Sequence, residues 1–389
     1  MRPVVLDITR TVSRTIKGRV TGIDRVERAY IGHFLEYPSP VFFFCRIGRH
    51  DMVLERDAMA TLYRLIGANG PWDRPALTAL RPRDGQRRYR IERTVRRLAR
   101  GHLPQAFAYL NVGHSNLGAG ALRKMRRAGA EPLAVLVHDM IPLDFPQFCR
   151  PETARMFERK MRSVVALADV VICNSEHTSG RLSHWAATWG KDAPVRQVIP
   201  LGTDPLPQPA ERPADARPYF VVLGTIEPRK NHRLLLDIWN GFTRTLPAGD
   251  IPHLHIIGER GWLNSGVFRT LDSADYMGKT VFEHGNLPDE AVARLLSGAR
   301  ALLFPSFAEG FGYPAIEALQ LGTPVVSAPL PSLQELAPRG IIFIDAEDAK
   351  TWADTILTIT RGAKPEVPAQ NFPDWASHFH NVATVISHS

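Results

Sequence analysis

The sequence predicts an α/β protein with two doubly wound parallel-sheet domains. Two observations carry this prediction. Predicted strands alternate with predicted helices over nearly the whole chain, and one proline-rich stretch interrupts the alternation. Alternating strands and helices form parallel sheets, because a parallel connection needs a crossover long enough to hold a helix. A chain of 389 residues is also long enough for two domains, each with its own core.

The proline-rich stretch is "TDPLPQPAERPADARP" (203–218), which holds five prolines and little that could pack. Such a composition is typical of a semi-rigid linker. We therefore predict an N-terminal domain over 1–204, a linker over 205–218 and a C-terminal domain over 219–370. The tail, 371–389, has an amphipathic pattern that predicts a helix, which we expect to cross back to the N-terminal domain.

Apolar runs and helical periodicity place the elements of both domains. In the first half, strands are predicted at 3–9, 41–45, 107–111, 133–138, 169–173 and 195–199, and helices at 22–36, 116–128 and 152–167. In the second half, strands are predicted at 219–224, 253–258, 280–283, 300–306 and 323–328, and helices at 231–240 and 288–297. Each half is therefore predicted to form one parallel sheet.

The composition indicates a globular protein of the cytoplasm. Hydrophobic residues make up 44% of the chain and charged residues 22%, shares that are typical of soluble proteins. The cysteines Cys45, Cys149 and Cys173 lie far apart, which argues against a disulfide framework or a zinc site and favours a reducing compartment. No apolar run has the length of a membrane span, and the first residues do not resemble an export signal.

The net charge of +9 is unevenly distributed along the chain. Up to Gly202 the chain holds 33 basic and 18 acidic residues, a net charge of +15; the remainder holds 15 and 21, a net charge of −6. The densest basic stretch is 81–102, where Ile91, Val95 and Leu98 would share one helical face. Such a basic half could face an anionic membrane, an acidic polymer or nucleic acid, or be only a solvated face. Nucleic acid is the weakest choice, because no helix-turn-helix or RNP-like pattern accompanies the charge.

The stretch "PSFAEGFGYPAIEALQLGTPVV" (305–326) is predicted to form a loop that opens into a helix and then a strand. Gly310 and Gly312 allow a tight turn, and free amides at the helix start would suit a phosphate or a sugar hydroxyl. Two carboxylates flank this turn. Glu309 would meet a ligand directly, and Glu317, inside the helix, could accept from two neighbouring hydroxyls. Alternatively, both glutamates only complement the helix dipole.

A second polar loop follows the strand that opens the second half, in "YFVVLGTIEPRKNHRLLLDIW" (219–239). It carries Glu227, Arg229 and Lys230 just before a helix predicted to begin near Asn231. Two cations beside a helix N-terminus predict a diphosphate site, since fixed amides and mobile positive charge would act on the ligand together. Taken alone, the same residues could be ordinary surface cations.

These segments resemble the donor-binding domain of family 4 retaining glycosyltransferases, which have the GT-B fold. The resemblance rests on "GTIEPRKNH", on "IIGERGW" (256–262) and on 282–336, where Glu309 and Glu317 match the E-x7-E signature. It is looser in the first half, where "TGIDRV", "VLVHDMIPLDFP", "ADVVICNSEHTSGRL" and "VIPLGTD" are similar to family segments. It implies two Rossmann-like domains facing across a cleft, as in bacterial polysaccharide and O-antigen mannosyltransferase-like enzymes.

Carried over residue by residue, the resemblance implies a donor site in the second half. Lys230, with Arg229 beside it, would neutralise the departing diphosphate. Thr225 departs from the family pattern, since many relatives have an arginine there, and Arg229 would replace it. Glu309 would hold hydroxyls of the donor sugar, and Glu317 would accept from the nucleotide ribose.

The resemblance also assigns backbone groups and residues of the first half. The amides of Gly310, Phe311 and Gly312 would assist in binding the donor sugar. Gly22 would let a loop of the first domain approach the phosphates. His138 would lie near the reacting sugar, although a lone histidine at a strand end is alternatively a structural hydrogen-bonding residue. The expected catalytic residues are therefore His138, Lys230 and Glu309.

The function implied by the resemblance is transfer of a hexose, with retention, from a nucleotide diphosphate sugar such as GDP-mannose. The acceptor would be lipid-linked or a polysaccharide in bacterial cell-surface glycan synthesis. No D-x-D follows a predicted cleft-facing strand, and "DAED" (345–348) is a predicted loop, so we expect no metal and no other cofactor. Three alternatives remain: another GT-B enzyme such as an epimerase or phosphorylase, a non-catalytic nucleotide-sugar-binding module of a synthase complex, and a nucleic-acid binder.

Overall fold

The structure is a computed structural model that describes residues 2–17, 22–66, 92–204, 206–207, 217–285, 287–336 and 339–388. The chain forms two compact units. Unit 1 comprises Met1–Met140, Arg155–Gly202 and Pro373–Ser389, and unit 2 comprises Ile141–Ala154 and Thr203–Phe372. Ile141–Ala154 packs with unit 2, although it lies within the range that the sequence assigned to the N-terminal domain.

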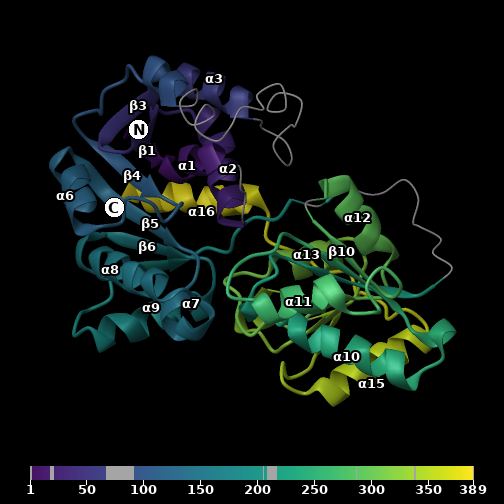
Figure 1. Ribbon diagram of the computed structural model, residues 1–389. Helices are drawn as coiled ribbons and strands as arrows, with labels where there is room; N and C mark the ends of the chain where they lie inside the picture. Colours follow the sequence, from purple (N-terminus) through teal and green to yellow (C-terminus); the bar gives the residue numbers. More distant parts are fainter. Residues whose placement is uncertain are drawn as a thin grey trace. The chain divides into compact units, whose positions relative to one another are not determined.

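Unit 1 is built on a seven-stranded sheet in the order β3-β2-β1-β4-β5-β6-β7 (Figure 1). Its strands are β1 (Val4–Asp7), β2 (Val41–Ile47), β3 (His50–Glu55), β4 (Phe107–Asn111), β5 (Ala130–Val137), β6 (Val170–Cys173) and β7 (Val195–Val198). All neighbouring pairs are parallel except β2 and β3, which are antiparallel. Only Gly48 and Arg49 separate these two strands, too few residues for a crossover, and Gly48 takes a positive φ of 62° that suits a tight turn. The prediction of parallel strands therefore fails at this edge.

The helices of unit 1 include three that the sequence predicted, with shifted bounds, and two that it missed. Those with a predicted counterpart are α2 (Gly22–Leu35), α6 (Ala119–Arg127) and α8 (Pro151–Leu167). Those without one are α1 (Thr9–Lys17) and α3 (Arg56–Ile66). Helix α9 (Glu176–Thr188) is capped by Ser175, the residue before it, whose side chain accepts from the Thr178 amide. None of the helices in the described part of the chain is long and apolar enough to cross a membrane.

Unit 2 contains a six-stranded sheet in the order β10-β9-β8-β11-β12-β13, with every neighbouring pair parallel. Its strands are β8 (Tyr219–Leu223), β9 (His253–Ile257), β10 (Val281–His284), β11 (Leu302–Phe304), β12 (Val325–Ser327) and β13 (Ile341–Phe343). Its α-helices are α7 (Ile141–Asp144), α10 (His232–Thr245), α11 (Ser265–Ser273), α12 (Asp289–Gly298), α13 (Tyr313–Gln320), α14 (Pro331–Leu336) and α15 (Ala349–Arg361). The sequence analysis missed α7, α11, α14, α15 and β13.

Both faces of the unit 2 sheet are covered, as its apolar strands predict. Alternate residues of β8 belong to two separate core clusters. Phe220 and Val222 pack in a cluster that includes residues of α10, α11 and α15, whereas Tyr219 and Val221 pack in one that includes residues of α12 and α13. This alternation follows from the pleat, since successive side chains of a strand point to opposite faces. A doubly wound sheet results, and its carboxyl edge carries the loops described below.

The C-terminal helix α16 (Trp375–His388) belongs to unit 1, far in sequence from the residues that it contacts. His378 is buried, and its Nδ1 lies 2.7 Å from the carbonyl oxygen of Pro200. A carbonyl can only accept, so Nδ1 carries the proton and Nε2 accepts from the Tyr30 hydroxyl at 2.6 Å. A Cβ at Gly202 would lie 2.4 Å from the Trp375 ring, so glycine permits this close packing.

Candidate functional site

The two polar loops of unit 2 meet at the carboxyl edge of its sheet. One loop follows β8 and the other follows β11, and these strands are neighbours. Parallel neighbours end at the same edge, so residues 79 positions apart come together there. The Nζ of Lys230 lies 2.5 Å from Oε1 of Glu309 and forms an ion pair with it. The structure thus joins two of the three residues that the resemblance assigned to catalysis.

Arg229 ties the same glutamate to a second carboxylate. One guanidinium nitrogen lies 2.9 Å from Oε2 of Glu309, and another lies 2.7 Å from Oε1 of Glu227. The guanidinium also donates to the carbonyl of Ala308, and the carbonyl of Arg229 accepts from the amide of Phe307 at 2.9 Å. Side chain and backbone of Arg229 therefore both connect the loop after β8 to the loop after β11.

Burial makes these charges depend on one another. Lys230 and the side chain of Glu309 are both more than nine-tenths buried. Burial by itself would raise the pKa of Glu309, but the nearby cations Arg229 and Lys230 outweigh it and lower the pKa to about 2. Burial also lowers the pKa of Lys230, and Glu309 opposes that shift. The lysine stays charged in the interior because its carboxylate partner is there.

The four charged groups neutralise one another. Glu227 and Glu309 carry two negative charges, and Arg229 and Lys230 carry two positive charges. The sequence predicted two cations ready for a diphosphate, whereas the structure shows both already paired with carboxylates. A diphosphate would therefore bind by drawing Arg229 and Lys230 away from Glu309 or by sharing them with it.

The glycine turn after Glu309 has a definite conformational requirement. Gly312 precedes α13 with φ of 97°, and a Cβ there would lie 2.5 Å from the Leu333 side chain. Only glycine meets both conditions without strain. Phe311 is buried and Gly310 half-buried, and Pro314 lies in the first turn of α13, where a missing amide proton costs no hydrogen bond.

Glu317 lies inside α13, past its first turn, and is only 3% exposed. The favourable effect of the helix dipole on a carboxylate falls off after the first turn, so it does not account for a buried glutamate at this position. Glu309 lies before the helix and is ion-paired instead. The alternative that both glutamates only complement the helix dipole therefore explains neither residue.

In unit 1, His138 follows β5 and is buried. Its Nε2 lies 2.7 Å from the carbonyl oxygen of Val112, so Nε2 carries the proton and donates, and its own carbonyl accepts from Asn174 at 2.9 Å. Burial lowers the pKa of His138 to about 4, and the bond to Val112 only partly opposes this. His138 therefore makes the contacts of a structural histidine, and its catalytic role stays a prediction.

Gly22 is the first residue of α2, and a Cβ there would meet nothing within 4 Å. The described structure therefore gives no local reason for glycine at this position, and its expected contact with phosphates stays a prediction. Residues 18–21, just before it, lie outside the described residues.

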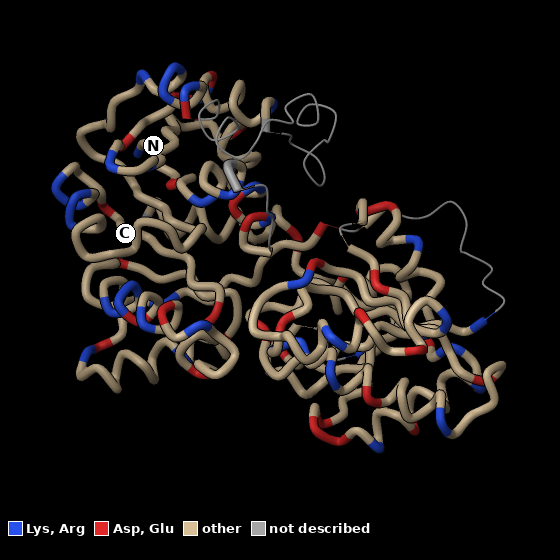
Figure 2. Tube along the Cα trace, in the orientation of Figure 1, with Lys and Arg blue, Asp and Glu red and all other residues tan. Residues whose placement is uncertain are grey.

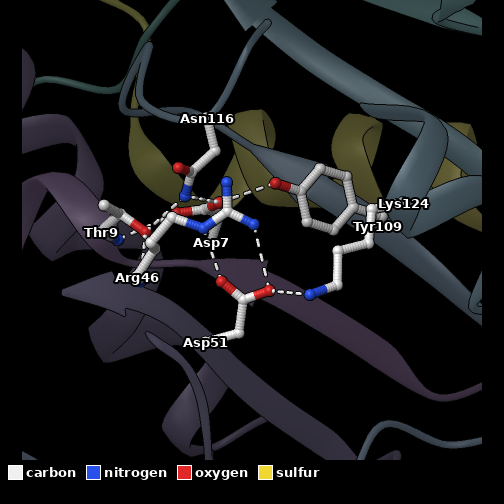
Figure 3. Close-up of polar contacts among 7 residues, drawn as sticks. All are labelled: Asp7, Thr9, Arg46, Asp51, Tyr109, Asn116 and Lys124. Atoms are coloured by element: carbon white, nitrogen blue, oxygen red, sulfur yellow. Dashed lines mark hydrogen bonds and ion pairs between the residues drawn. The ribbon is translucent and has the colours of Figure 1, made fainter. Parts of the chain in front are cut away.

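The sequence left Asp7 without an assigned role, as either a turn residue or a cleft-facing one, and the structure places it in a buried polar cluster at the carboxyl end of β1 (Figure 3). Asp7 accepts hydrogen bonds from the Tyr109 hydroxyl at 2.7 Å, from Asn116 at 2.9 Å and from the Thr9 amide at 2.9 Å. Burial raises the pKa of Asp7, although these donors oppose it. An aspartate at the end of a buried strand was the available signal, but its partners come from elsewhere in the chain.

Glu27, on α2, is a second buried acid that sequence reasoning missed. It is 0% exposed, and its Oε1 accepts from the Thr11 amide at 2.7 Å. Its Oε2 has no hydrogen-bond partner among the described residues, and a Cβ at Gly113 would lie 1.8 Å from it. Burial raises the pKa of Glu27 to about 8, against the opposing effect of the Thr11 amide. This glutamate is therefore largely protonated at neutral pH.

Basic residues are concentrated in α6, where the trace is blue in Figure 2, and they are Arg123, Lys124, Arg126 and Arg127. Of the predicted basic stretch, residues 81–91 lie outside the described residues, and Val95 beyond them is buried. Contact with an anionic membrane stays a prediction.

The described residues contain no group of three or more histidines, cysteines or acids that could hold a metal. The expectation that the protein needs no metal likewise stays a prediction.

The family described as "Glycosyl transferases group 1" matches residues 208–370, the part of the chain that carries both polar loops. The match covers less than half of the chain, and over this range the chain is similar to a glycosyl transferases group 1 domain. Serotype-specific mannosyltransferase WbdA of Escherichia coli is 30% identical over 271 residues, 64% of this chain and 33% of that protein. O-antigen chain mannosyltransferase B of the same species is 27% identical over 236 residues, 57% of this chain and 59% of that protein. The match to WbdA thus spans about a third of that relative's length.

The family match is limited to residues 208–370, whereas two solved structures align with nearly the whole chain. HepE of Anabaena in complex with UDP superposes with a TM-score of 0.62 at 16% identity, covering 99% of each chain. The lipopolysaccharide outer core galactosyltransferase WaaB in its apo form gives a TM-score of 0.56 at 16% identity, again over 99% of each chain. Identities this low show the fold alone. The fold is GT-B, as predicted.

Replacing Glu27 by glutamine should change stability in a pH-dependent manner. Because its folded-state pKa is raised from 4.5 to about 8, the stability that protonated Glu27 contributes is fully present below pH 4.5 and lost as pH rises through about 8. Glutamine keeps the shape of the protonated carboxyl and cannot ionise. At pH 9 we expect Glu27→Gln to be more stable than wild type by up to about 5 kcal/mol, and at pH 4.5 nearly equal to it.

Urea unfolding at both pH values measures this difference. Glu36→Gln, at an exposed position near the end of α2, is the matched control and should change stability by less than about 0.5 kcal/mol. A Glu27→Gln variant that is less stable than wild type at both pH values would show that the fold needs an ionised carboxylate there.

Proposed function

We propose that this protein is a retaining glycosyltransferase that moves a hexose from a nucleotide diphosphate sugar to a lipid-linked or polysaccharide acceptor. The network of Lys230, Arg229 and Glu309 is the observation that carries the proposal. It places two cations and a carboxylate together at the carboxyl edge of the sheet, in the range that matches the group 1 family. Mannosyltransferases of O-antigen synthesis among the relatives make GDP-mannose the first donor to test.

In the proposed reaction, the charge on the leaving nucleoside diphosphate is met by this chain's own cations. Lys230 and Arg229 turn from Glu309 toward the phosphates as negative charge develops there, and they act in a buried site where electrostatic effects are strong. Glu309, released in part from its ion pairs, accepts from hydroxyls of the donor sugar. The neutral starting network also limits binding of weakly charged ligands, since only a strong anion competes with a carboxylate.

Retention of the anomeric configuration is the part of the proposal that comes from the family resemblance. The charges in the site favour one of the two mechanisms that give retention. Double displacement needs a nucleophilic carboxylate on the opposite face of the sugar. Glu309 is poorly suited to that role, because two cations hold it and lower its pKa to about 2. We therefore favour attack by the acceptor on the same face, with the departing phosphate oxygen taking the acceptor's proton.

A donor panel tests the proposed function directly. Purified protein is incubated with labelled GDP-mannose, UDP-glucose and dTDP-glucose, and release of free sugar is followed over time. We expect slow hydrolysis of one donor, GDP-mannose first, because water can replace the acceptor. A free sugar with inverted configuration would contradict retention, an epimerised nucleotide sugar would indicate an epimerase, and binding without turnover even with acceptors would indicate a non-catalytic module.

Turnover should not depend on a divalent metal. The proposed site stabilises the leaving diphosphate with Lys230 and Arg229, so EDTA should leave the hydrolysis rate within about twofold of the untreated rate. The measurement is the donor hydrolysis rate with EDTA, and after readdition of magnesium or manganese. Loss of activity in EDTA with recovery on adding either ion would contradict this prediction.

Three substitutions should affect donor turnover in different ways. Glu309→Gln removes charge at the reacting sugar and should lower turnover by roughly 100-fold, far more than nucleotide affinity. Glu317→Gln weakens a contact that is equal in ground and transition states, so it should mainly raise KM, by about tenfold. Lys230→Ala should do both, because the diphosphate is bound first and gains charge as it leaves.

Stability separates these effects from misfolding. Glu309→Gln leaves the buried Lys230 and the partly buried Arg229 without their shared partner and should also cost about 3 kcal/mol, measured by urea unfolding. If folded variants of Glu309 and Glu317 had unchanged turnover and unchanged donor affinity, the donor site could not lie at these two residues.

A further inference from the structure

Unit 2 contains a row of aromatic side chains that the proposed donor site does not use. We call it the aromatic ridge, and it consists of Phe145, Phe148, Phe307 and Trp262. The ring centroids of Phe145 and Phe148 are 6.1 Å apart, and those of Phe148 and Phe307 are 5.2 Å apart, with ring planes within 19° in both pairs. The indole Nε1–H of Trp262 donates to the carbonyl of Phe148 at 3.2 Å. Three stretches of chain, far apart in sequence, thus build one ridge.

The aromatic ridge borders the loop that carries Arg229 and Lys230. The amide of Phe307 donates to the carbonyl of Arg229 at 2.9 Å, and Phe307 precedes Glu309 by two residues. On the other side, the amide of Gly261, the residue before Trp262, donates to the carbonyl of Ile226 at 3.1 Å. Two of the three stretches that form the ridge are therefore hydrogen-bonded to the loop of the proposed diphosphate site.

Trp262 is an apolar side chain that is partly exposed to water, which is energetically unfavourable. It is 37% exposed and Leu263 after it is 56% exposed, so two large apolar side chains stand together in water. Leu263 also has a positive φ of 52°, a conformation that costs a leucine free energy. Strain and apolar exposure at one place are typical of a binding loop. The hydrogen bond of Trp262 also fixes its ring, so little side-chain freedom is left to lose on binding.

We propose that the aromatic ridge, with Trp262 at its exposed end, binds a pyranose ring of the acceptor saccharide beside the donor site. This inference rests on the proposed transferase function. A pyranose has an apolar C–H face that packs on an aromatic ring while its hydroxyls point to water or polar groups. Gln147 and Arg150, on the same segment as Phe148, are exposed and offer such groups.

The size of the exposed area favours a sugar ring over a lipid chain. Phe145, Phe148 and Phe307 are half-buried, whereas Trp262 and the adjacent Leu263 are exposed. A long acyl or polyprenyl chain needs many methylene groups buried at once for firm binding. One pyranose is comparable in size to one indole ring, and an immobilised tryptophan is a frequent main contributor to binding energy.

Two variants of Trp262 and one control test the inference. Trp262→Ala removes the ring, Trp262→Phe keeps an aromatic face but loses the hydrogen bond to Phe148, and Trp189→Ala removes a tryptophan that lies under Arg162 in unit 1. Binding of mannotriose, maltotriose and chitotriose is measured by calorimetry and saturation-transfer NMR. On the same samples, the affinities for GDP and UDP and the melting temperature are measured.

Wild type should bind at least one trisaccharide, and Trp262→Ala should weaken that binding about tenfold or more. Trp262→Phe should lie between the two, Trp189→Ala should match wild type, and nucleotide affinity should stay within about twofold throughout. The inference is overturned if wild type binds no trisaccharide, or if Trp262→Ala binds as wild type does. It is also overturned if Trp262→Ala lowers nucleotide affinity and the melting temperature together, since the ridge would then only stabilise the loops. Trisaccharide binding through Trp262 without turnover of any nucleotide sugar would instead show that the transferase function fails.

Discussion

The buried ion pair between Lys230 and Glu309 is the interaction on which the candidate site depends. It joins two loops from neighbouring strands, and neither charge is tolerable in the interior without the other. Arg229 extends the pair to Glu227 and to the backbone after β11, so the loops are held in one geometry before any ligand arrives. The site is therefore organised in advance, but its cations are occupied, and a ligand must be anionic enough to compete for them.

Two buried glutamates show how the environment decides what one residue type does. Glu309 lies between two cations, which overcome its desolvation and hold its pKa at about 2. Glu27 has a single amide on one oxygen and no partner for the other among the described residues, and desolvation raises its pKa to about 8. Glu309 is a fixed charge of the proposed donor site, whereas Glu27, on α2, holds a proton near neutral pH beside the Thr11 amide of α1.

Much of the fold could be predicted from the sequence, because buried parallel strands are continuous apolar runs that need no knowledge of their neighbours. The elements missed are those whose local pattern is weak. Helix α1, "TRTVSRTIK", has only two strongly apolar residues, and β3 is recognisable chiefly from its hairpin with β2. Likewise, nothing in the sequence of Ile141–Ala154 indicates that it packs with unit 2, since that depends on contacts with distant residues.

The sequence by itself determined the loop residues and their order: the glycine turn, the two glutamates and the adjacent cations, with the family resemblance giving them roles. Only the tertiary structure decided that Lys230 and Arg229 are already paired with carboxylates, because charge neutralisation needs residues 79 positions apart to meet at one sheet edge. It also decided that Trp262 is hydrogen-bonded to the backbone of Phe148, whose ring stacks on Phe307, and this requires three separate stretches to pack together. Local pattern specifies elements; burial and distant contacts specify their chemistry.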